Sequence, residues 1–532
     1  MLRRVAAPAA LLAVCAGLTL YGLGRPLLWV DEAETALLAR SILVHGIPEA
    51  RVGKDLISQE IGREFGTDLV WRWTPWLDKY VAAGAFALLG EGTASARLPF
   101  ALFGLACVGS IYFLGRSLFD DRRIALLAMA FLGTSVPFLL HVRQCRYYAL
   151  AILGTIWAVH FAAATVRRPG WRAPAGLALA MTGVFHANYL TFAALSLALA
   201  VALWALGIGR AAFARLCLAA AAIALVNGPW VVFFDIFGKS ERSGGFNDIF
   251  AMEYLGLTLR YSFPAVAVPV FAALALATRR REILAEWRVT LFLAVIPVVY
   301  LAVLCFGLFR FYRYSVNLLP VFALLLAWMS VRAWQMQRVA GGIFAVLLLV
   351  TGVFYQISAL PTRYAGSLPE VSFHELDWGF PLGNFLYELA YPFEGAMGTA
   401  TVYLGQHARP GDRVYVSYGD LTARFYLTGL EIRGGQTGES LEGWGPPEWL
   451  VVRRFFRFIG RTVPGSDAQA TLDWLNAMPW DRYEGIDLGV PDLAWESIPE
   501  PEWHWFRRPP LGHAVGPAII SHQVSQGPVH GR

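Results

Sequence analysis

The chain has 532 residues, of which 57% are hydrophobic and 15% are charged. This balance is too apolar for a soluble protein of that length and predicts a polytopic membrane protein. The net charge of +6 does not indicate nucleic-acid binding, because the arginines form short clusters between apolar segments, as topology determinants do. The five cysteines show no CxxC or paired spacing, so the sequence predicts neither a disulfide framework nor a metal cluster.

The first apolar run, residues 5–23, follows a basic flank and has the general form of a signal peptide. We expect it to remain as a first span, because Val14 stands where a lipoprotein cleavage box usually needs a small residue. The stretch that follows, "WVDEAETALLAR" (residues 29–40), places Asp31 and Glu32 side by side just beyond this span.

About eleven runs are long and apolar enough to cross a membrane, given that a spanning helix needs ~20 mostly apolar residues. One further run, residues 76–89, is short and contains Asp78 and Lys79, so we expect a helix that lies on or in the outer leaflet. The predicted spans are residues 5–23, 94–114, 124–140, 148–166, 173–190, 191–206, 216–237, 263–278, 289–308, 315–331 and 339–360.

The arginine clusters fall on alternate links between these runs, and the positive-inside rule then places the N-terminus in the cytoplasm. An odd number of spans puts the part after residue 360 outside, and Asp31 and Glu32 are outside as well. We therefore expect a multi-pass protein of the plasma (inner) membrane with an extracytoplasmic C-terminal domain. The predicted inner links contain Arg3 and Arg4; Arg116, Arg122 and Arg123; Arg167, Arg168 and Arg172; Arg210 and Arg215; Arg279, Arg280, Arg281 and Arg288; and Arg332 and Arg338.

The predicted fold is an all-α polytopic membrane domain, residues 1–360, followed by a small α/β domain, residues 361–507. Residues 24–92 form a long first outer loop, in which an amphipathic stretch, residues 56–73, precedes the leaflet helix. In the α/β domain, a "RPGD" turn precedes an alternating strand at residues 413–418, and a helix begins at Leu421. Residues 508–532 are rich in Gly, Pro, Ser and His, which predicts disorder.

The acid pair admits two interpretations. Asp31 followed by Glu34 fits a helix capping box, and acidic residues in a first turn favour the helix dipole. Capping does not explain the adjacent Glu32. A partly desolvated carboxylate at the membrane face is also positioned to take a proton from a hydroxyl group.

Two arginine pairs lie on the predicted outer side, where the topology does not require them. Arg143 and Arg146 are three residues apart, as are Arg310 and Arg313, so each pair is expected to share a helical face. Guanidinium groups at the lipid boundary suit phosphate, which they bind bidentately. Ordinary snorkelling to lipid headgroups is the alternative. Lys79 adds a further cation on the same side.

Several aromatic residues accompany these cations on the outer side. Trp73 and Trp76 form either an interfacial belt or a platform for sugar or lipid, and Tyr147 and Tyr148 are expected at the interface. His186 interrupts a span near its outer end, where it either packs in a kink of the helix or contacts the substrate.

The chemistry that fits this arrangement is glycosyl transfer. Nucleotide-activated donors are not generally available outside the cytoplasm, and the chain has no nucleotide-binding motif, so a sugar on a membrane phosphate carrier is the expected donor. The arginines and the lysine would hold the phosphate, while a carboxylate deprotonates the acceptor hydroxyl. Direct displacement would invert the configuration of the sugar.

These segments resemble GT-C glycosyltransferases of the protein O-mannosyltransferase and lipid A aminoarabinose-transferase (ArnT-like) superfamily. The resemblance covers "DEAETALLARSIL", "ARLPFALFGLACVGSIYFLGRSLF", "RQCRYYAL" and "RYSVNLLPVFALLL", together with a proline-containing motif in the first outer loop. It implies a GT-C fold, Asp31 as catalytic base with Glu32 as its neighbour, and a polyprenyl-phosphate sugar as donor. The acceptor would be a lipid, glycan or protein, and the α/β tail favours a bacterial enzyme.

The motif of the first outer loop departs from this superfamily. Mannosyltransferases often have "HPPLGKLL" where this chain has "TPWLDKYV", so Lys79 matches while Thr74 and Trp76 replace a histidine and a proline. We predict no metal and no other cofactor, although a divalent ion stays open. A flippase or transporter of lipid-linked sugars, or a non-catalytic subunit that binds the carrier, are the alternative functions. The nearly uncharged spans favour the transferase over the transporter.

Overall fold

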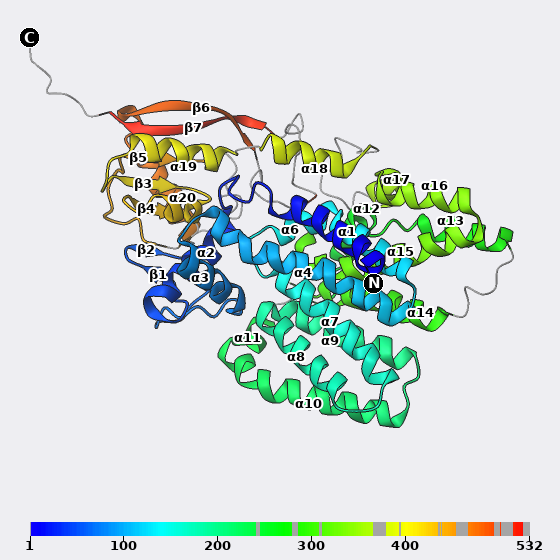
Figure 1. The fold of residues 1–532 in the computed structure, drawn as a ribbon. Coiled ribbons are helices and arrows are strands. Elements are labelled where there is room, and N and C mark those ends of the chain that lie inside the picture. The colour runs from blue at the N-terminus through cyan, green and yellow to red at the C-terminus, as the bar shows by residue number, and fades with distance from the viewer. Residues whose placement is uncertain are drawn as a thin grey trace, which may run out of the picture.

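The computed structural model describes residues 2–524 apart from 241–244, 279–285, 308–310, 365–378, 393–394, 435–436, 438, 454–466, 494–500 and 502–513. It is a helical bundle with a small α/β domain at one end (Figure 1). This confirms the predicted fold class.

The bundle is built from helices that, apart from the long first outer loop between α1 and α4, follow one another through shorter links. In chain order they are α1 (Leu2–Leu20), α4 (Thr93–Phe119), α5 (Arg122–Gly133), α6 (Val136–Val142), α7 (Tyr148–Arg167), α8 (Arg172–Ala187), α9 (Tyr189–Ala205), α10 (Arg210–Phe233), α11 (Ile236–Ser240), α12 (Asp248–Tyr261), α13 (Ala267–Thr278), α14 (Trp287–Leu304), the 3₁₀ turns η2 (Tyr312–Tyr314) and η3 (Val316–Leu318), α15 (Leu319–Met336), α16 (Arg338–Leu349) and α17 (Val353–Tyr364).

Every predicted span overlaps a helix, but two predicted spans are bent pairs. α5 and α6 meet at 64°, where Pro137 opens the second helix, and α16 and α17 meet at 67°. The described residues contain five helices long and apolar enough to cross a membrane, or seven if each bent pair is one span, besides three shorter apolar helices. The count of eleven spans therefore stays a prediction.

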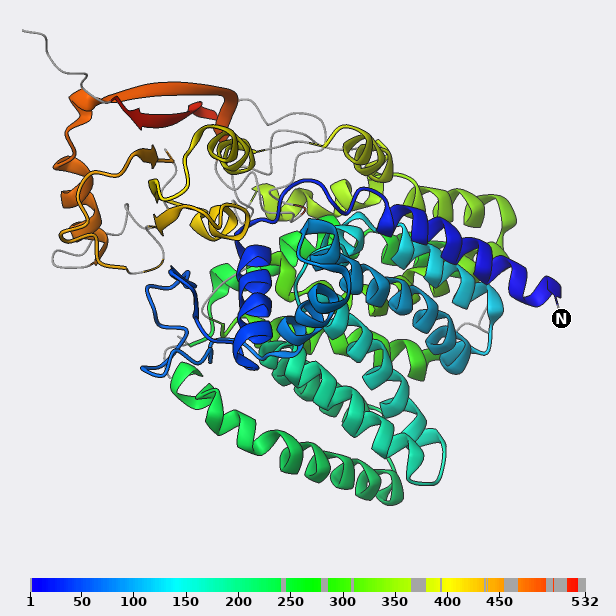
Figure 2. The same cartoon turned by 60° about the vertical axis from the view of Figure 1, so that its left-hand side comes forward.

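Helix α4 extends from one end of the bundle to the other. At its first residue, the Thr93 hydroxyl lies 2.6 Å from the Tyr426 hydroxyl of the α/β domain. Near its last turn, the Ser117 carbonyl accepts a hydrogen bond from Arg167, which belongs to a predicted inner link. The N-terminus also lies at the end of the bundle away from the sheet (Figure 2).

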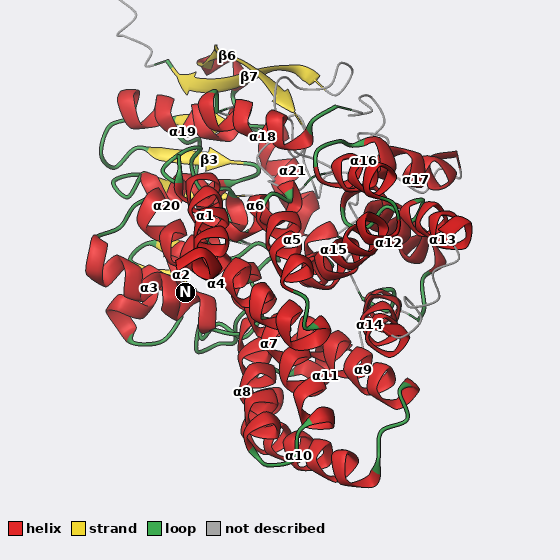
Figure 3. Ribbon diagram, turned by 45° about the vertical axis from the view of Figure 1, so that its right-hand side comes forward, coloured by secondary structure: helices red, strands yellow, loops and turns green. Residues whose placement is uncertain are grey.

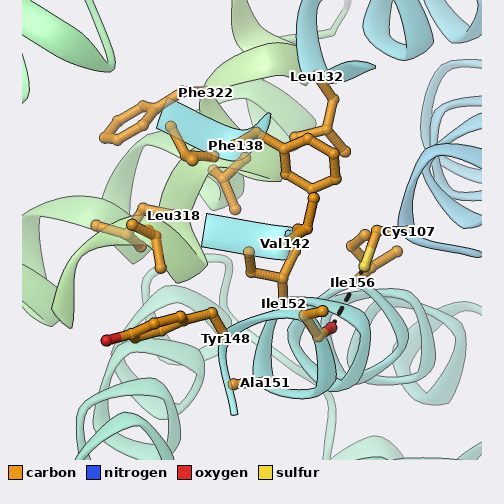
Figure 4. Packing of buried hydrophobic residues seen from close by; sticks show 14 of the residues in the cluster. Cys107, Leu132, Phe138, Val142, Tyr148, Ala151, Ile152, Ile156, Leu318 and Phe322 are labelled. Atoms are coloured by element: carbon orange, nitrogen blue, oxygen red, sulfur yellow. Dashed lines mark hydrogen bonds between the residues drawn. The ribbon is translucent and has the colours of Figure 1, made fainter. Parts of the chain in front are cut away.

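The core of the bundle fixes the turn between α6 and α7. Phe138, Val142, Tyr148 and Ile152 pack in one buried cluster (Figure 4). Helices α4 and α6 approach so closely that a Cβ atom added at Gly104 would lie 2.7 Å from the Val142 Cβ. This packing holds residues 143–147 against the start of α2.

The first outer loop lies at the same end as the α/β domain (Figure 1). It contains α2 (Val30–His45), the short antiparallel strands β1 (Arg51–Val52) and β2 (Asp55–Leu56), and α3 (Leu77–Leu89). Helix α3 coincides with the predicted leaflet helix. The predicted amphipathic stretch, residues 56–73, forms no helix and instead wraps around the fully buried Trp71.

The α/β domain is a five-stranded mixed sheet in the order β4-β3-β5-β7-β6, with helices on both faces. Val414 and Val416 of β3 pack with α19 and α20, whereas Tyr415 points to the other face, where Leu475 of α21 packs. Figure 3 shows the strands next to α19 and α20. The elements are α18 (Pro381–Ala390), α19 (Ala396–His407), β3 (Arg413–Val416), α20 (Asp420–Tyr426), β4 (Glu431–Gly434), β5 (Trp449–Val451), α21 (Asp467–Asn476), η6 (Trp480–Arg482), β6 (Tyr483–Leu493) and β7 (Ala514–Gln523).

Strand β7 corrects the prediction of disorder from residue 508 onward. It pairs antiparallel with both β5 and β6. Its order comes from the backbone hydrogen bonds that these two strands supply, and composition alone does not reveal such partners.

Candidate active site

Helix α2 begins at Val30, with Trp29 as the N-cap residue. Asp31 is the second residue of the helix and not its cap, so the capping interpretation of Asp31 is wrong. Glu32, the third residue, has the capping contact, because its carboxylate accepts a hydrogen bond from the Trp29 amide at 3.4 Å.

The Glu32 carboxylate is fully buried, and both of its oxygens accept hydrogen bonds. Its two oxygens accept hydrogen bonds from Nε and Nη2 of Arg97 at 2.8 and 2.5 Å, and the Cys145 amide donates to Oε1 at 2.8 Å. Arg97 also donates to the carbonyl groups of Pro26 and Leu27. Glu32 thus connects α4, the loop before α2 and the α6–α7 turn, which fits a positioning residue.

Asp31 faces away from this ion pair, because successive residues of an α-helix point about 100° apart. Its Oδ2 atom lies 3.5 Å from Nη2 of Arg146 and 3.7 Å from Nη2 of Arg313. The residue is 8% exposed. A carboxylate is therefore set between two guanidinium groups that come from distant parts of the chain.

Arg146 is held in place by α2 itself. Its Nη1 atom donates to the Asp31 carbonyl at 3.0 Å, to Oε1 of Glu34 at 2.9 Å and to the Thr35 hydroxyl at 3.1 Å. Arg313 stacks over the rings of Phe311 and Trp29, with its Cζ atom 3.9 and 5.6 Å from their centroids. Both cations are thus oriented before any ligand enters.

These groups line a cavity of about 380 Å³, called the Asp31 cavity below. One part of its lining is charged, and another part is apolar and comes from α9, α14 and the segment after α14. The cavity is lined by Asp31, Glu34, Gln59, Glu60, Glu64, Trp73, Thr74, Arg146, Tyr147, Asn188, Tyr189, Leu190, Ala193, Ile236, Lys239, Val303, Phe306, Gly307, Phe311, Arg313 and Tyr314.

The acidic wall of this cavity contains residues that the sequence did not indicate. Gln59 donates from Nε2 to Glu34 at 2.7 Å, while Glu64 accepts hydrogen bonds from the Ser58 hydroxyl and from the amides of Gln59 and Glu60. Burial raises the pKa of Glu64 to about 7, against the lowering effect of these hydrogen bonds. The segment has no helical or strand period, so its residue spacing could not predict this site.

Lys239 is a second group of the cavity that was not among the predicted site residues. Its ammonium donates to the Arg72 carbonyl at 2.6 Å and lies over the rings of Trp73 and Tyr189. It follows a predicted span on the predicted outer side, where the topology does not require a basic residue. The outer arginines were selected for the same reason. Trp73 and Tyr147 were predicted as contacts, and both line the cavity.

Six of the predicted site residues that the structure describes lie outside the lining of this cavity: Glu32, Lys79, Trp76, Arg143, Tyr148 and His186. Lys79 is buried in an ion pair with Asp78 at 3.0 Å and donates to the Thr74 hydroxyl at 2.8 Å. It therefore contacts a residue of the cavity lining without lining the cavity itself. Trp76, Tyr148 and His186 take part in ring packing: Trp76 and His186 against Trp230, and Tyr148 against His141.

The prediction that Arg143 and Arg146 share a helical face is wrong. Residues 143–147 form the turn between α6 and α7, so the three-residue spacing does not have its helical meaning there. Arg143 donates to the carbonyl groups of Leu18 and Thr19 and lines a second cavity of about 450 Å³. This cavity, called the Arg143 cavity, lies between the bundle and the α/β domain. Arg310 lies outside the described residues.

Among the residues that the structure describes, no group of three His, Cys, Asp or Glu side chains could hold a metal ion. The expectation that transfer needs no metal stays a prediction.

Comparison with known proteins gave a family match and several structural matches. Residues 74–233 match the family model described as dolichyl-phosphate-mannose-protein mannosyltransferase. ArnT from Cupriavidus metallidurans, solved bound to undecaprenyl phosphate and in the apo state, is similar with a TM-score of 0.54 and 17% identity, over 81% of this chain and 85% of that chain. An oligosaccharyltransferase from Archaeoglobus fulgidus matches with a TM-score of 0.46 and 14% identity, over 79% of this chain and 62% of that chain. No curated protein sequence matches the chain.

The similarity to ArnT shows the fold, and it extends over most of both chains. The family match covers α4 to α10 together with the motif "TPWLDKYV", on which part of the sequence-based resemblance rested. The apolar helices, the ArnT-like fold and the family match over residues 74–233 together support a multi-pass membrane protein that is similar to GT-C glycosyltransferases of the ArnT and protein-mannosyltransferase type.

Proposed function

We propose that this protein transfers a sugar from a polyprenyl-phosphate donor to a hydroxyl group of a lipid, glycan or protein on the extracytoplasmic side. The observation that carries the proposal is the Asp31 carboxylate, which lies within 3.7 Å of two guanidinium groups at the wall of a partly apolar cavity. A general base and a phosphate clamp in one cavity are the two parts that such a transfer needs.

The cations account for donor binding. Arg146 and Arg313 can each offer two N–H groups to phosphate oxygens, and Lys239 adds a third positive charge. The apolar part of the lining, with Leu190, Val303 and Phe306, suits a polyprenyl chain. That ArnT from Cupriavidus metallidurans was solved with undecaprenyl phosphate supports this class of donor.

The reaction is a single displacement. Asp31 takes the proton from the acceptor hydroxyl group, and the oxygen of that hydroxyl group forms a bond to the anomeric carbon of the sugar. The bond between that carbon and the phosphate oxygen breaks, and polyprenyl phosphate leaves with its charge on the cations. Because phosphate oxygens compete with Asp31 for Arg146 and Arg313, donor binding releases the carboxylate for its role as a base. Direct attack inverts the anomeric configuration.

The Asp31→Asn variant tests the proposal. Asparagine keeps the shape of the side chain but cannot accept the proton, so transfer should slow ~100-fold to 10,000-fold while polyprenyl phosphate still binds. The measurement is the release of polyprenyl phosphate from lipid-linked sugars by purified protein in nanodiscs, with carrier binding measured separately. Asp68→Asn changes an exposed aspartate of the same loop and serves as the control.

Near-normal transfer by Asp31→Asn would refute the catalytic role and favour a subunit that only binds the carrier. Movement of the intact lipid-linked sugar across the bilayer, without release of polyprenyl phosphate, would favour the transporter. Mass spectrometry of the lipids, glycans and glycoproteins of a deletion strain identifies the sugar and its acceptor.

A further inference from the structure

Helix α20 of the α/β domain contacts the residue that precedes α2 through both of its backbone groups. The Leu28 amide donates to the Tyr426 hydroxyl at 3.0 Å, and the Thr422 hydroxyl donates to the Leu28 carbonyl at 3.0 Å. Thr422 and Tyr426 are four residues apart and therefore share one face of α20. Figure 1 shows this helix next to α2.

Leu28 lies one residue before the N-cap of α2 and three residues before Asp31. Trp29, the N-cap, contacts Arg313 with its ring, and the Asp31 carbonyl contacts Arg146. The segment from Leu28 to Asp31 therefore carries the base and contacts both cations, Arg313 through the Trp29 ring and Arg146 through the Asp31 carbonyl. A shift at Leu28 changes the position of the carboxylate relative to both guanidinium groups.

The α20 helix is itself anchored on the membrane side. The Tyr426 hydroxyl also bonds the Thr93 hydroxyl at the start of α4, at 2.6 Å. Arg40 of α2 donates to the Phe425 carbonyl at 3.1 Å, and the Phe425 ring stacks on Phe86 of α3 at 6.1 Å. Contacts with three helices of the membrane domain make α20 a fixed support and not a loosely resting element.

We propose that α20 is a positioning element for Asp31: Thr422 and Tyr426 hold Leu28 and so set the first turn of α2 in the geometry that transfer requires. The inference rests on the proposed function of Asp31. It assigns to the α/β domain a role in the rate of transfer, exerted through two hydroxyl groups.

The same geometry separates rate from affinity. In the described part of the chain, no residue of α20 lines the Asp31 cavity, and each cation also has a contact outside residues 28–31: Arg146 with Glu34, Arg313 with Phe311 and Lys239 with the Arg72 carbonyl. Loss of the two hydroxyl contacts should therefore lower kcat and leave the binding of polyprenyl phosphate unchanged. A misplacement of about 1 Å at a reacting group can cost about 100-fold in rate, so a roughly 10-fold or larger fall in kcat is expected for Thr422→Val combined with Tyr426→Phe.

The test combines hydrogen exchange with kinetics on the full-length protein in nanodiscs. Amide exchange of residues 29–33 should rise in Thr422→Val, in Tyr426→Phe and in the double variant, and kcat should fall with KM for the donor unchanged. Thr422→Ser restores the hydroxyl and should restore both readings.

Two matched controls carry the same substitutions elsewhere in the α/β domain. Thr401→Val removes a buried hydroxyl that bonds only the Met397 carbonyl of its own helix among the described residues. Tyr415→Phe removes a buried hydroxyl for which the described residues provide no hydrogen-bond partner. Both should leave exchange at α2 and kcat unchanged.

Unchanged exchange at residues 29–33 in the double variant would overturn the inference, as would a rise in donor KM with kcat preserved. The exchange measurement needs no substrate, so it separates this inference from the proposed function. Faster exchange at α2 in a protein whose wild type transfers no sugar would support the coupling and refute the transferase.

Discussion

Two adjacent carboxylates of this chain have different surroundings and therefore different tasks. Glu32 is fully buried and bound by Arg97 and the Cys145 amide, whereas Asp31 faces a cavity between Arg146 and Arg313. Loss of Glu32 would leave the buried Arg97 charge without its acid, which affects folding before chemistry. Under the proposed function, loss of the Asp31 charge is expected to affect chemistry first.

The outer arginines should differ in their effect on donor binding. Arg146→Ala and Arg313→Ala each remove a charged hydrogen-bonding group from the Asp31 cavity and should weaken polyprenyl-phosphate binding by ~1.5 to 3 kcal/mol. Arg143→Ala, the control, changes a residue of the Arg143 cavity and should bind normally. Direct binding of polyprenyl phosphate to the purified variants is the measurement. Equal losses in all three would contradict the separation of the two cavities.

Glu64 should make the stability of the protein depend on pH. Burial raises its pKa from 4.5 to about 7 in the folded protein, with the nearby Glu34 adding to the shift. The folded chain thus holds a proton that the unfolded chain has lost, so the free energy of unfolding falls as pH rises from 4.5 to about 7.

Glu64→Gln removes this dependence and keeps an acceptor for the backbone amides. The variant should gain up to about 3 kcal/mol at pH 8 relative to the parent and little at pH 4. The melting temperature in detergent at both pH values provides the measurement. If the melting temperatures of the parent and the variant fell equally between pH 4 and pH 8, Glu64 would be excluded as the titrating group.

At the scale of elements, one buried arginine fastens the α/β domain to the first outer loop. Arg424 of α20 is fully buried and pairs with Asp420, Glu439 and, at 3.5 Å, Asp55 of β2. Burial raises the pKa of Asp420 to about 6 even though Arg424 lowers it, so the arginine offsets a cluster of desolvated acids.

Arg424→Met should therefore destabilise the contact between β2 and α20 by about 3 to 5 kcal/mol, because three carboxylates lose their shared cation. Limited proteolysis and the melting temperature report this loss. Arg433→Met, on the neighbouring strand β4, removes a partly exposed ion pair with Glu431 and should cost less than about 1 kcal/mol. Equal behaviour of the two variants would count against a special role for Arg424.

The sequence predicted most helices and only part of the site, for physical reasons. Long apolar runs determine helices in lipid, so the runs at 94–114 and 148–166 coincide with α4 and α7. Asp31 was found because a charge at the membrane face is costly. The spacing rule for Arg143 and Arg146 failed at a turn, and the contacts of Gln59 and Glu64 depend on long-range folding of an irregular loop.

At the scale of the whole molecule, the topology of the bundle is the property to test. Two described arginines of the predicted inner links lie at the far end of α4, where Arg332 pairs with Asp121 and Arg167 donates to the Ser117 carbonyl, and the positive-inside rule assigns this end to the cytoplasm. We therefore expect a reporter fused after Gly411 to be active outside the cytoplasm and one fused after Gly170 to be active inside it. Activity of both fusions on one side would refute the topology and, with it, the outward site.

The length of α4 also sets the depth of the chemistry. Arg97 and Arg116 are 19 residues apart on one continuous helix, which corresponds to about 28 Å. The hydrocarbon layer of a bilayer is about 30 Å thick, so the Arg97–Glu32 pair lies level with the lipid headgroups when Arg116 lies at the opposite boundary. A phosphate carried by a lipid already travels at that depth. If the proposed function holds, the donor reaches Asp31 by lateral diffusion, and its supply is governed by the number of carrier molecules per area of leaflet rather than by a concentration in water.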